Sequence, residues 1–259
     1  MGEVLTRAEE KLLFALRRRP EREERGLFLA EGVRVVEALV ESRVGIELAV
    51  VAEDLPETPR GAALLDGLES RAPVRTVPGH VLARVAATES PQGVVAAAHI
   101  PRASLDTVPV PERSTVLVLD AVQDPGNFGT LVRCADAFAA DFVLALAGTV
   151  DAWNPKAVRA AAGSSFHVPI LEAATGPGIA WLAGHGYRIL AADIHGDPVA
   201  GIAAAARTAL VVGNEGAGVG EAVRAAAALR VAVPIRGSAE SLNVSVAAGI
   251  LLYLLTRER

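Results

Sequence analysis

Hydrophobic residues in the first hundred positions recur at spacings that alternate between helical and strand-like. Leucines share one helical face from about Arg7 to Arg19, where Pro20 ends the pattern, and valines and leucines do so from Gly32 to Ser42. A third helical pattern covers about residues 61–70. Short apolar runs predict strands at 48–51, 74–77 and 94–99. This part of the chain is therefore predicted to be a small α/β domain.

The second half differs, because its strand-like runs are apolar at almost every position. Such runs occur at 116–119, 142–146, 188–192 and 209–212. Helical patterns lie between them at about 128–139, 155–162 and 178–183, and an apolar helix closes the chain. Strands without polar alternation are typical of parallel sheets that helices cover on both faces. The predicted fold class is α/β, and ligand sites are expected in loops beyond the carboxyl ends of the strands.

A segment without apolar periodicity separates the two halves. Residues 100–113 contain Pro101, Pro109 and Pro111 among serine and threonine, which is typical of a linker. The sequence therefore predicts an N-terminal domain over residues 1–99, a linker over 100–113 and a second domain over 114–259.

Composition narrows the class of protein. The chain has 259 residues, of which 51% are hydrophobic, so it can form real cores and is not a disordered tail. Its single cysteine, Cys134, excludes a disulfide scaffold and argues against a cysteine-based metal site. No uninterrupted apolar stretch is long enough for a membrane span, and Met1–Glu10 is too charged for a signal peptide. A soluble cytoplasmic protein is expected.

The net charge of −5 argues against a protein that binds polyanions indiscriminately, since such proteins are usually basic. Aromatic residues make up 4% of the chain, so stacking on single-stranded nucleic acid is not the expected mode of binding either. If this chain binds a nucleic acid, few arginine–phosphate contacts are therefore expected.

Three loops that follow predicted strands carry the candidate chemistry. In the first, Asn127 is placed to cap a helix and Arg133 follows two turns later, although a plain cap with a surface arginine is the alternative. In the second, glycines surround Glu215 over residues 211–218, which is also compatible with a simple turn. In the third, over 233–247, Ser241, Asn243 and Ser245 gather at the start of the last helix, where backbone amides suit an anion.

Taken together, the three loops resemble the SpoU (TrmH-like) branch of the SPOUT RNA methyltransferases. The matching patterns are Asn127-x-Gly-x-x-x-Arg133, Gly213-Asn-Glu-Gly216 and Pro234-x-x-Gly-x-x-x-Ser-Leu-Asn-Val-Ser-Val-Ala247, in that order. The segments Leu27-Phe-Leu-Ala-Glu-Gly32 and Thr88-Glu-Ser-Pro-Gln-Gly93 resemble the substrate-binding domain common in that family. The resemblance thus covers most of the chain.

The resemblance implies transfer of a methyl group from S-adenosylmethionine to a ribose 2′-hydroxyl of RNA, without a metal. It also implies a homodimer and a SPOUT domain with a C-terminal trefoil knot, which no periodicity could show. Carried onto this chain, the residues expected to bind the cofactor are Val212, Gly213, Asn214, Gly216, Val233, Ile235, Gly237 and Leu242.

The same resemblance assigns the catalytic role to Arg133. Because arginine keeps its proton in proteins, we expect Arg133 to bind the phosphate beside the target ribose and polarise the hydroxyl. Asn127, Glu215, Ser241 and Asn243 are expected to orient Arg133, the RNA and the cofactor. The arginines expected to contact RNA, with a solvated helix end as the alternative, are Arg17, Arg18, Arg19, Arg22, Arg25 and Arg34.

Several alternatives stay open at this point. A separate N-terminal domain favours 23S rRNA as substrate over tRNA. A non-catalytic RNA-binding or assembly protein on the same fold is a second possibility, which the complete set of motifs disfavours. An unrelated α/β nucleotide enzyme is disfavoured because neither a P-loop nor a GxGxxG loop is present.

Overall fold

The computed structural model describes residues 5–88, 90–199, 202 and 205–257. The chain divides into two compact units, and their boundaries do not follow the chain order. Unit 1 consists of residues 1–101 together with 151–167, and unit 2 consists of residues 102–150 together with 168–259. Among the described residues, no helix is long and apolar enough to cross a membrane.

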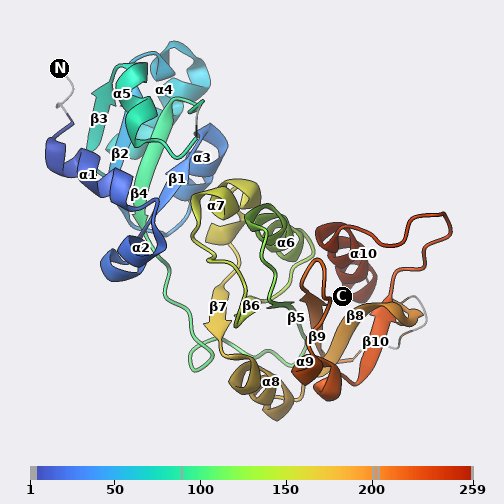
Figure 1. The fold of residues 1–259 in the computed structure, drawn as a ribbon. Helices are drawn as coiled ribbons and strands as arrows, with labels where there is room; N and C mark the ends of the chain where they lie inside the picture. Colours follow the sequence, from blue (N-terminus) through green and yellow to red (C-terminus); the bar gives the residue numbers. More distant parts are fainter. Residues whose placement is uncertain (1–4, 89, 200–201, 203–204, 258–259) are drawn as a thin grey trace. The chain divides into compact units, whose positions relative to one another are not determined.

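Unit 1 is built on a four-stranded mixed sheet in the order β1-β4-β2-β3 (Figure 1). Strand β4 runs antiparallel to both β1 and β2, whereas β2 and β3 are parallel. The strands are β1 (Leu27–Glu31), β2 (Ile46–Ala52), β3 (Val74–Val77) and β4 (Val94–His99). The helices are α1 (Arg7–Ala15), α2 (Arg19–Arg25), α3 (Val33–Glu41), α4 (Pro59–Glu69) and α5 (Gly79–Val85), with a short turn η1 (Leu55–Glu57).

The helix predicted from Arg7 to Arg19 is shorter, and a second helix that was not predicted begins at Arg19. A capping box of Thr6 and Glu9 starts α1, whose last residue is Ala15. Pro20 lies in the first turn of α2, where a missing backbone N–H costs nothing, so this proline helps to start a helix and does not end α1. Gly26 closes α2 in the left-handed conformation, with φ of 63°.

Residues 151–167 were predicted to belong to the second domain, but they group with unit 1. This segment forms α7 (Pro155–Ala161) and the turn η2 (Ser164–Phe166). The ring of Phe28 in β1 packs against Trp153 at 4.7 Å and Phe166 at 5.8 Å between centroids. Gly163 fits closely against α3, because a Cβ there would lie 2.4 Å from the Cβ of Ala38. These contacts join residues far apart in the sequence, so local periodicity could not predict them.

Unit 2 contains a six-stranded sheet in the order β10-β8-β9-β5-β6-β7, and every pairing in it is parallel. This confirms the predicted parallel α/β sheet. The strands are β5 (Ser114–Asp120), β6 (Val143–Leu146), β7 (Ile170–Ala173), β8 (Arg188–Pro198), β9 (Arg207–Gly213) and β10 (Leu229–Ala232).

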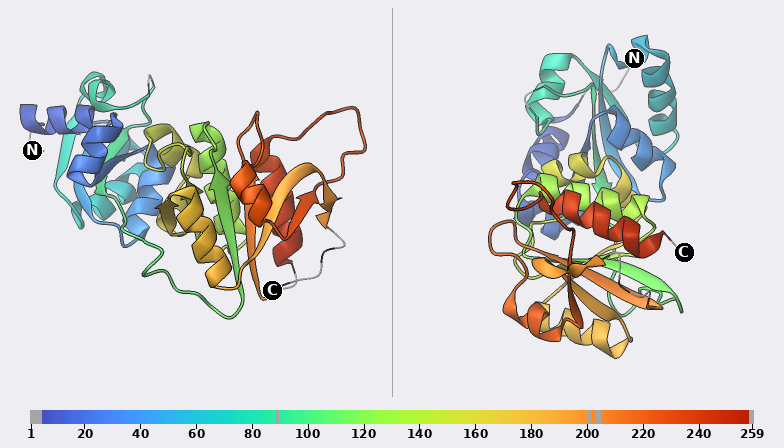
Figure 2. Two further views of the ribbon diagram at one scale, coloured as in Figure 1. Left: turned by 60° about the horizontal axis from the view of Figure 1, so that its bottom comes forward. Right: turned by 90° about the vertical axis from the view of Figure 1, so that its right-hand side faces the viewer.

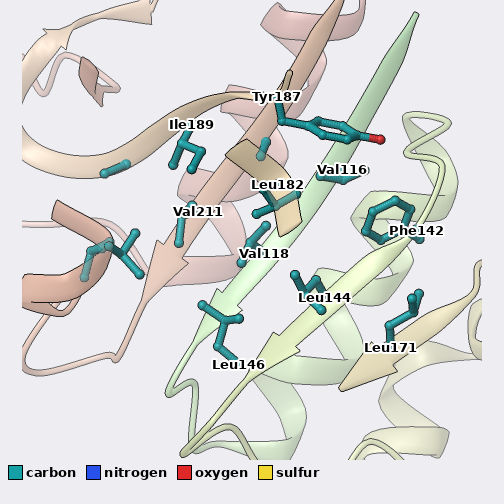
Figure 3. Packing of buried hydrophobic residues seen from close by; sticks show 14 residues of the cluster. Val116, Val118, Phe142, Leu144, Leu146, Leu171, Leu182, Tyr187, Ile189 and Val211 are labelled. Atoms are coloured by element: carbon teal, nitrogen blue, oxygen red, sulfur yellow. The ribbon is translucent and has the colours of Figure 1, made fainter. Parts of the chain in front are cut away.

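Helices cover both faces of this sheet (Figure 2). One face carries α6 (Pro125–Ala137) and α10 (Val244–Thr256), and the other carries α8 (Thr175–Gly184) and α9 (Glu221–Ala226). Alternate residues of each strand point to opposite faces. Val116, Val118 and Phe142 accordingly pack toward α8 and α9, in the cluster shown in Figure 3. Burial on both faces explains why these strands lack polar alternation.

The predicted linker lies partly against unit 2. No helix or strand is assigned between β4 and β5, as the prolines indicate. However, four of its apolar side chains pack onto the core of unit 2; they are Ala103, Leu105, Val108 and Val110. The segment therefore contributes to the core of unit 2.

Candidate active site

The candidate site lies where the strand order of unit 2 reverses direction. Strands β5, β6 and β7 follow one another outward from the centre, whereas β9, β8 and β10 extend the other way. Strand β5 therefore pairs with β9, and the pairing ends at Asp120 opposite Gly213. Loops that leave such adjacent strands diverge and open a crevice at their carboxyl ends. All three loops that carry the sequence motifs begin at this edge of the sheet.

Asn127 joins two of these loops through its side chain. Its Nδ2 donates to Oε1 of Glu215 at 3.0 Å, and its Oδ1 accepts from Nδ2 of Asn243 at 3.0 Å. The sequence placed Asn127 as the helix cap, but Asp124 caps α6 by accepting from the backbone N–H of Asn127 at 2.8 Å. Because Asp124 does the capping, the amide of Asn127 is available to connect the motifs.

Asn243 begins the last helix and completes this connection. It is the N-cap of α10, and its Oδ1 accepts from the backbone N–H of Ser245 at 2.9 Å. Ser245 is buried, and its Oγ donates to the backbone oxygen of Asn127 at 3.2 Å. Ser241 is exposed on the preceding loop. The network thus fixes the start of α10 against the start of α6.

Glu215 is held as an anion. Burial by itself raises the pKa of its carboxyl, but hydrogen bonds from the Asn127 side chain and from nearby backbone amides outweigh this and lower the pKa overall. Two of those amides belong to Gln123 and Asp124, which donate at 3.3 and 3.2 Å. A fixed negative charge therefore lies between the first and second loops.

A cavity of about 590 Å³ opens beside this network. Its walls come from the ends of β8, β9 and β10, from the following loops and from α10. The predicted site residues that line it are Val212, Gly213, Asn214, Glu215, Gly216, Val233, Ile235, Ser241, Leu242 and Asn243. Asn127, Arg133 and Gly237 are not among its lining residues.

Gly213 of the second loop is needed for a close backbone approach. A Cβ on Gly213 would lie 2.2 Å from the backbone of Gly218, which faces it across the loop. Asn214 locks this loop, since its Nδ2 donates to Ala121 and its Oδ1 accepts from the backbone amides of Gly216 and Ala217, all at 3.0 Å. The cavity wall is therefore rigid backbone with little room for side chains.

Arg133 lies in α6, six residues after Asn127, and its side chain is exposed. It forms no hydrogen bond or ion pair with any other residue that the structure describes. Its neighbour Cys134 is half-buried; burial raises the pKa of the thiol, and the charge of Arg133 opposes this. The thiol is thus kept protonated, whereas the guanidinium of Arg133 is free to contact a ligand.

Several residues at or beside this site were not predicted from the sequence. Asp120 ends β5 and is buried, with Oδ2 accepting from the backbone N–H of Gly220 at 2.7 Å. Arg224, Glu240 and the residues 191–194 of β8 line the cavity. A polar residue at the end of an apolar strand, such as Asp120, is the one signal that could have indicated this edge.

Five of the six predicted RNA-contacting arginines lie in or just before α2, and all five have partners within the protein. The prediction for Arg22 is wrong, because this side chain is 2% exposed and forms an ion pair with Asp151. Arg17 is half-buried and donates to the backbone oxygens of Arg84 and Ala86. The exposed members Arg18, Arg19 and Arg25 each pair with a glutamate of α2. Most of this cluster therefore stabilises unit 1.

Comparison with known proteins identifies the family. The SpoU rRNA Methylase family model matches residues 114–253, and the MRM3-like substrate binding domain model matches residues 10–96. The 23S rRNA (guanosine(2553)-2′-O)-methyltransferase RlmP of Bacillus subtilis is 37% identical over 241 residues, covering 93% of this chain and 92% of that protein.

Two comparisons involve Streptomyces viridochromogenes. Its 23S rRNA (uridine(2479)-2′-O)-methyltransferase is 35% identical over 178 residues, covering 66% of this chain and 62% of that protein. The crystal structure of the SpoU methyltransferase AviRb in complex with the cofactor AdoMet matches with a TM-score of 0.87 and 30% identity, covering 98% of both chains. This chain therefore belongs to the SpoU rRNA methylase family.

Proposed function

We propose that this protein is an S-adenosylmethionine-dependent methyltransferase that modifies a ribose 2′-hydroxyl of 23S rRNA. The observation that carries the proposal is the hydrogen-bonded connection of Asn127, Glu215 and Asn243 at the mouth of the cavity, with Arg133 free on the same helix as Asn127. Unit 2 is the proposed catalytic part, and unit 1 is the proposed RNA-binding part.

The cavity suits S-adenosylmethionine. Its wall includes the backbone of Gly213, and Val233, Ile235 and Leu242 supply apolar surface that suits a flat adenine ring. Gly216 would present its backbone carbonyl, whereas the backbone groups of Asn214 already pair with Gly218, so Asn214 is proposed to hold the wall in shape, with Val212 behind it. Gly237 would follow on the third loop. When bound, the cofactor supplies an activated methyl group on its sulfonium.

Arg133 is the proposed catalytic residue. Because its guanidinium is exposed and free of partners among the described residues, it can bind the phosphate beside the target ribose and polarise the 2′-hydroxyl. The anionic Glu215, fixed by Asn127, provides negative charge beside the cofactor cavity. Asn243 holds Asn127 in place, and Ser241 at the rim is proposed to contact RNA.

The rRNA target is favoured by the extent of similarity. RlmP matches this chain over nearly its whole length, including the N-terminal part, whereas the uridine(2479) enzyme matches about two thirds of it. We therefore propose the guanosine that corresponds to position 2553 as the first candidate nucleotide. With a ribosomal RNA substrate, we propose that the reaction takes place in the cytoplasm.

Two finer features belong to the same proposal. The first is a homodimer, supported by an apolar stripe on α10 in which Val246, Ile250 and Tyr253 are 51%, 36% and 54% exposed at helical spacing. The second is a trefoil knot formed by the C-terminal segment. It is supported by α10 packing on α6 and β9 after a loop that shares the cavity with the loop following β9.

The proposal is tested by methyl transfer and mapping. Purified protein is incubated with radiolabelled S-adenosylmethionine and unmodified 23S rRNA, and 2′-O-methylated nucleotides are located by alkaline cleavage and sequencing. Methylation at one ribose is expected, together with restoration of that mark in a Bacillus subtilis strain lacking RlmP. Cofactor binding without transfer to any 23S rRNA nucleotide, but with transfer to tRNA, would move the assignment to tRNA. Absence of cofactor binding would indicate a non-catalytic protein.

A further inference from the structure

Two sequence segments that the catalytic proposal leaves without a role lie side by side in unit 1. They are β1 with the Gly32 that follows it, and residues 88 and 90–93, which precede β4. Glu31, which is 4% exposed, joins them. Its Oε2 accepts from the backbone N–H of Ala87 at 2.8 Å, and its Oε1 accepts from the hydroxyl of Thr88.

Gly32 allows the two segments to lie close together. Its backbone N–H donates to Val94 at 3.1 Å, and its φ of 94° is a conformation that other residues rarely adopt. A Cβ at this position would lie 3.2 Å from the side-chain oxygen of Gln92. The chain therefore keeps backbone without a side chain next to the polar end of Gln92, and such backbone allows a ligand to approach closely.

A cavity of about 320 Å³ opens at this junction and lies entirely within unit 1. Its polar lining consists of Glu31, Arg34, Thr88, Ser90, Gln92 and Arg159. Arg34 begins α3 and Arg159 belongs to α7, the helix that residues 151–167 add to unit 1. The inserted segment therefore contributes a cation to the rim of this cavity.

The two arginines differ from those of α2. Arg34 and Arg159 are exposed, and neither forms a hydrogen bond or ion pair with another residue in the described part of the chain. Arg34 interacts electrostatically with Glu37, one turn along α3, but the carboxylate of Glu37 accepts a hydrogen bond from Arg60. Two free guanidinium groups thus border a cavity lined with hydroxyl, amide and carboxylate groups.

We propose that this cavity binds one unstacked nucleotide of the RNA substrate; the proposal rests on the function proposed above. Arg34 and Arg159 contact the phosphodiester, and the hydroxyl and amide groups of Ser90 and Gln92 contact the edge of the base. The start of α3, which has no side-chain cap, adds positive potential at the phosphate. Glu31 is a positioning residue, since both of its oxygens hold the 87–88 loop in place.

A charge-matched pair of double variants tests the phosphate contacts in the full-length protein. Arg34→Ala with Arg159→Ala removes both rim charges, whereas Arg7→Ala with Arg43→Ala removes two exposed charges of unit 1 outside the cavity. Affinity for transcribed 23S rRNA is measured by filter binding over a range of salt concentrations. The cavity variant is expected to bind at least about tenfold more weakly, with a salt slope smaller by about 1.4. The control variant is expected to change less on both measures.

A second pair tests occupancy without changing charge. Ser90→Trp fills the cavity, and Ala83→Trp adds the same bulk at an exposed position of α5. Ser90→Trp is expected to weaken RNA binding about tenfold with an unchanged salt slope, while Ala83→Trp binds like the parent. Melting temperature and S-adenosylmethionine affinity are expected to stay at parental values in all four variants.

The outcomes separate this inference from the proposed function. If the parent methylates 23S rRNA and both cavity variants bind and methylate it as the parent does, the nucleotide site is overturned and the enzyme assignment stands. If the parent transfers no methyl group, the enzyme assignment fails, yet the affinities for 23S rRNA still decide whether the cavity binds RNA. Equal losses in the cavity and control arginine variants would show general attraction of charge and would also overturn the inference.

Discussion

Replacing Asn127 by aspartate reverses the electrostatics of the site with almost no change in shape. The Nδ2 group that donates to Glu215 at 3.0 Å becomes an oxygen, so a hydrogen bond is replaced by two facing carboxylates. The lost bond costs about 0.5–1.5 kcal/mol. Repulsion of two unit charges about 4 Å apart adds ~1 kcal/mol in water and ~4 kcal/mol at the effective dielectric of a protein surface. Because Glu215 is exposed, the lower part of this range is expected.

The sign of the pH dependence follows from the pKa of Glu215. In the parent this pKa is lowered, so its contribution to stability is present above the unfolded value of 4.5 and is lost as the pH falls through the folded value. In the variant, one carboxyl of the pair has a raised pKa, so its contribution is present at low pH and is lost as the pH rises. The free energy of unfolding of parent and variant should therefore diverge between pH 4 and pH 7.

Urea unfolding of both proteins at several pH values measures this divergence, and methyl transfer at pH 7.5 measures the functional cost. A fall in kcat/KM of about 10–100-fold corresponds to the loss of ~1.4–2.7 kcal/mol of transition-state stabilisation. Asn154→Asp is the matched control, because Asn154 caps α7 by accepting from Lys156 at 2.9 Å, and aspartate caps equally well. Parallel stability curves for parent and Asn127→Asp, with full activity, would refute the role given to this network.

Other predictions concern single steps of the proposal. Arg133→Lys is expected to lower kcat/KM at least about tenfold while cofactor affinity by titration calorimetry stays parental, because a point charge replaces a bidentate donor; unchanged turnover would contradict this. Gly213→Ala should abolish cofactor binding, since its Cβ would lie 2.2 Å from Gly218, whereas Gly237→Ala meets open space and should keep the parental melting temperature. Ile250→Glu is expected to convert the dimer to a monomer in sedimentation velocity; a parent that already sediments as a monomer would disprove the dimer.

The hydrophobic pattern was sufficient to predict the central strands of unit 2 but not the strand at the edge of its sheet. Strand β5 was predicted because its residues are apolar on both faces, and the structure buries all seven of them. Strand β10, Leu229–Ala232, lies at the sheet edge, where one exposed arginine interrupts a four-residue run. Such a run is too short to distinguish from a loop by periodicity. Strand β1, Leu27–Glu31, was missed for a similar reason, although all five of its residues are buried.

At the site, the motifs identified the residues that meet but not the way in which they meet. Asn127 was interpreted as a helix cap, because asparagine at such a position usually is one. Asp124, three residues earlier, is the cap instead: it accepts from the backbone N–H of Asn127, and Pro125 takes the first helical position. The burial of Ser245 could not be predicted from the sequence. It depends on the packing of α10 against α6, which no local pattern encodes.

The acidity of the chain can be reconciled with an RNA substrate once each arginine is placed. A net charge of −5 says little about affinity when charges are paired. In the most basic cluster of the sequence, most charges are neutralised by ion pairs. Arg22 pairs with Asp151, and the exposed arginines in or just before α2 pair with glutamates. Among the described residues, the exposed arginines without a partner include Arg133, which follows the first catalytic loop on α6, and Arg34 with Arg159, which line the cavity of unit 1. Few well-placed arginine–phosphate contacts predict a weak salt dependence, which suits recognition of folded RNA by shape.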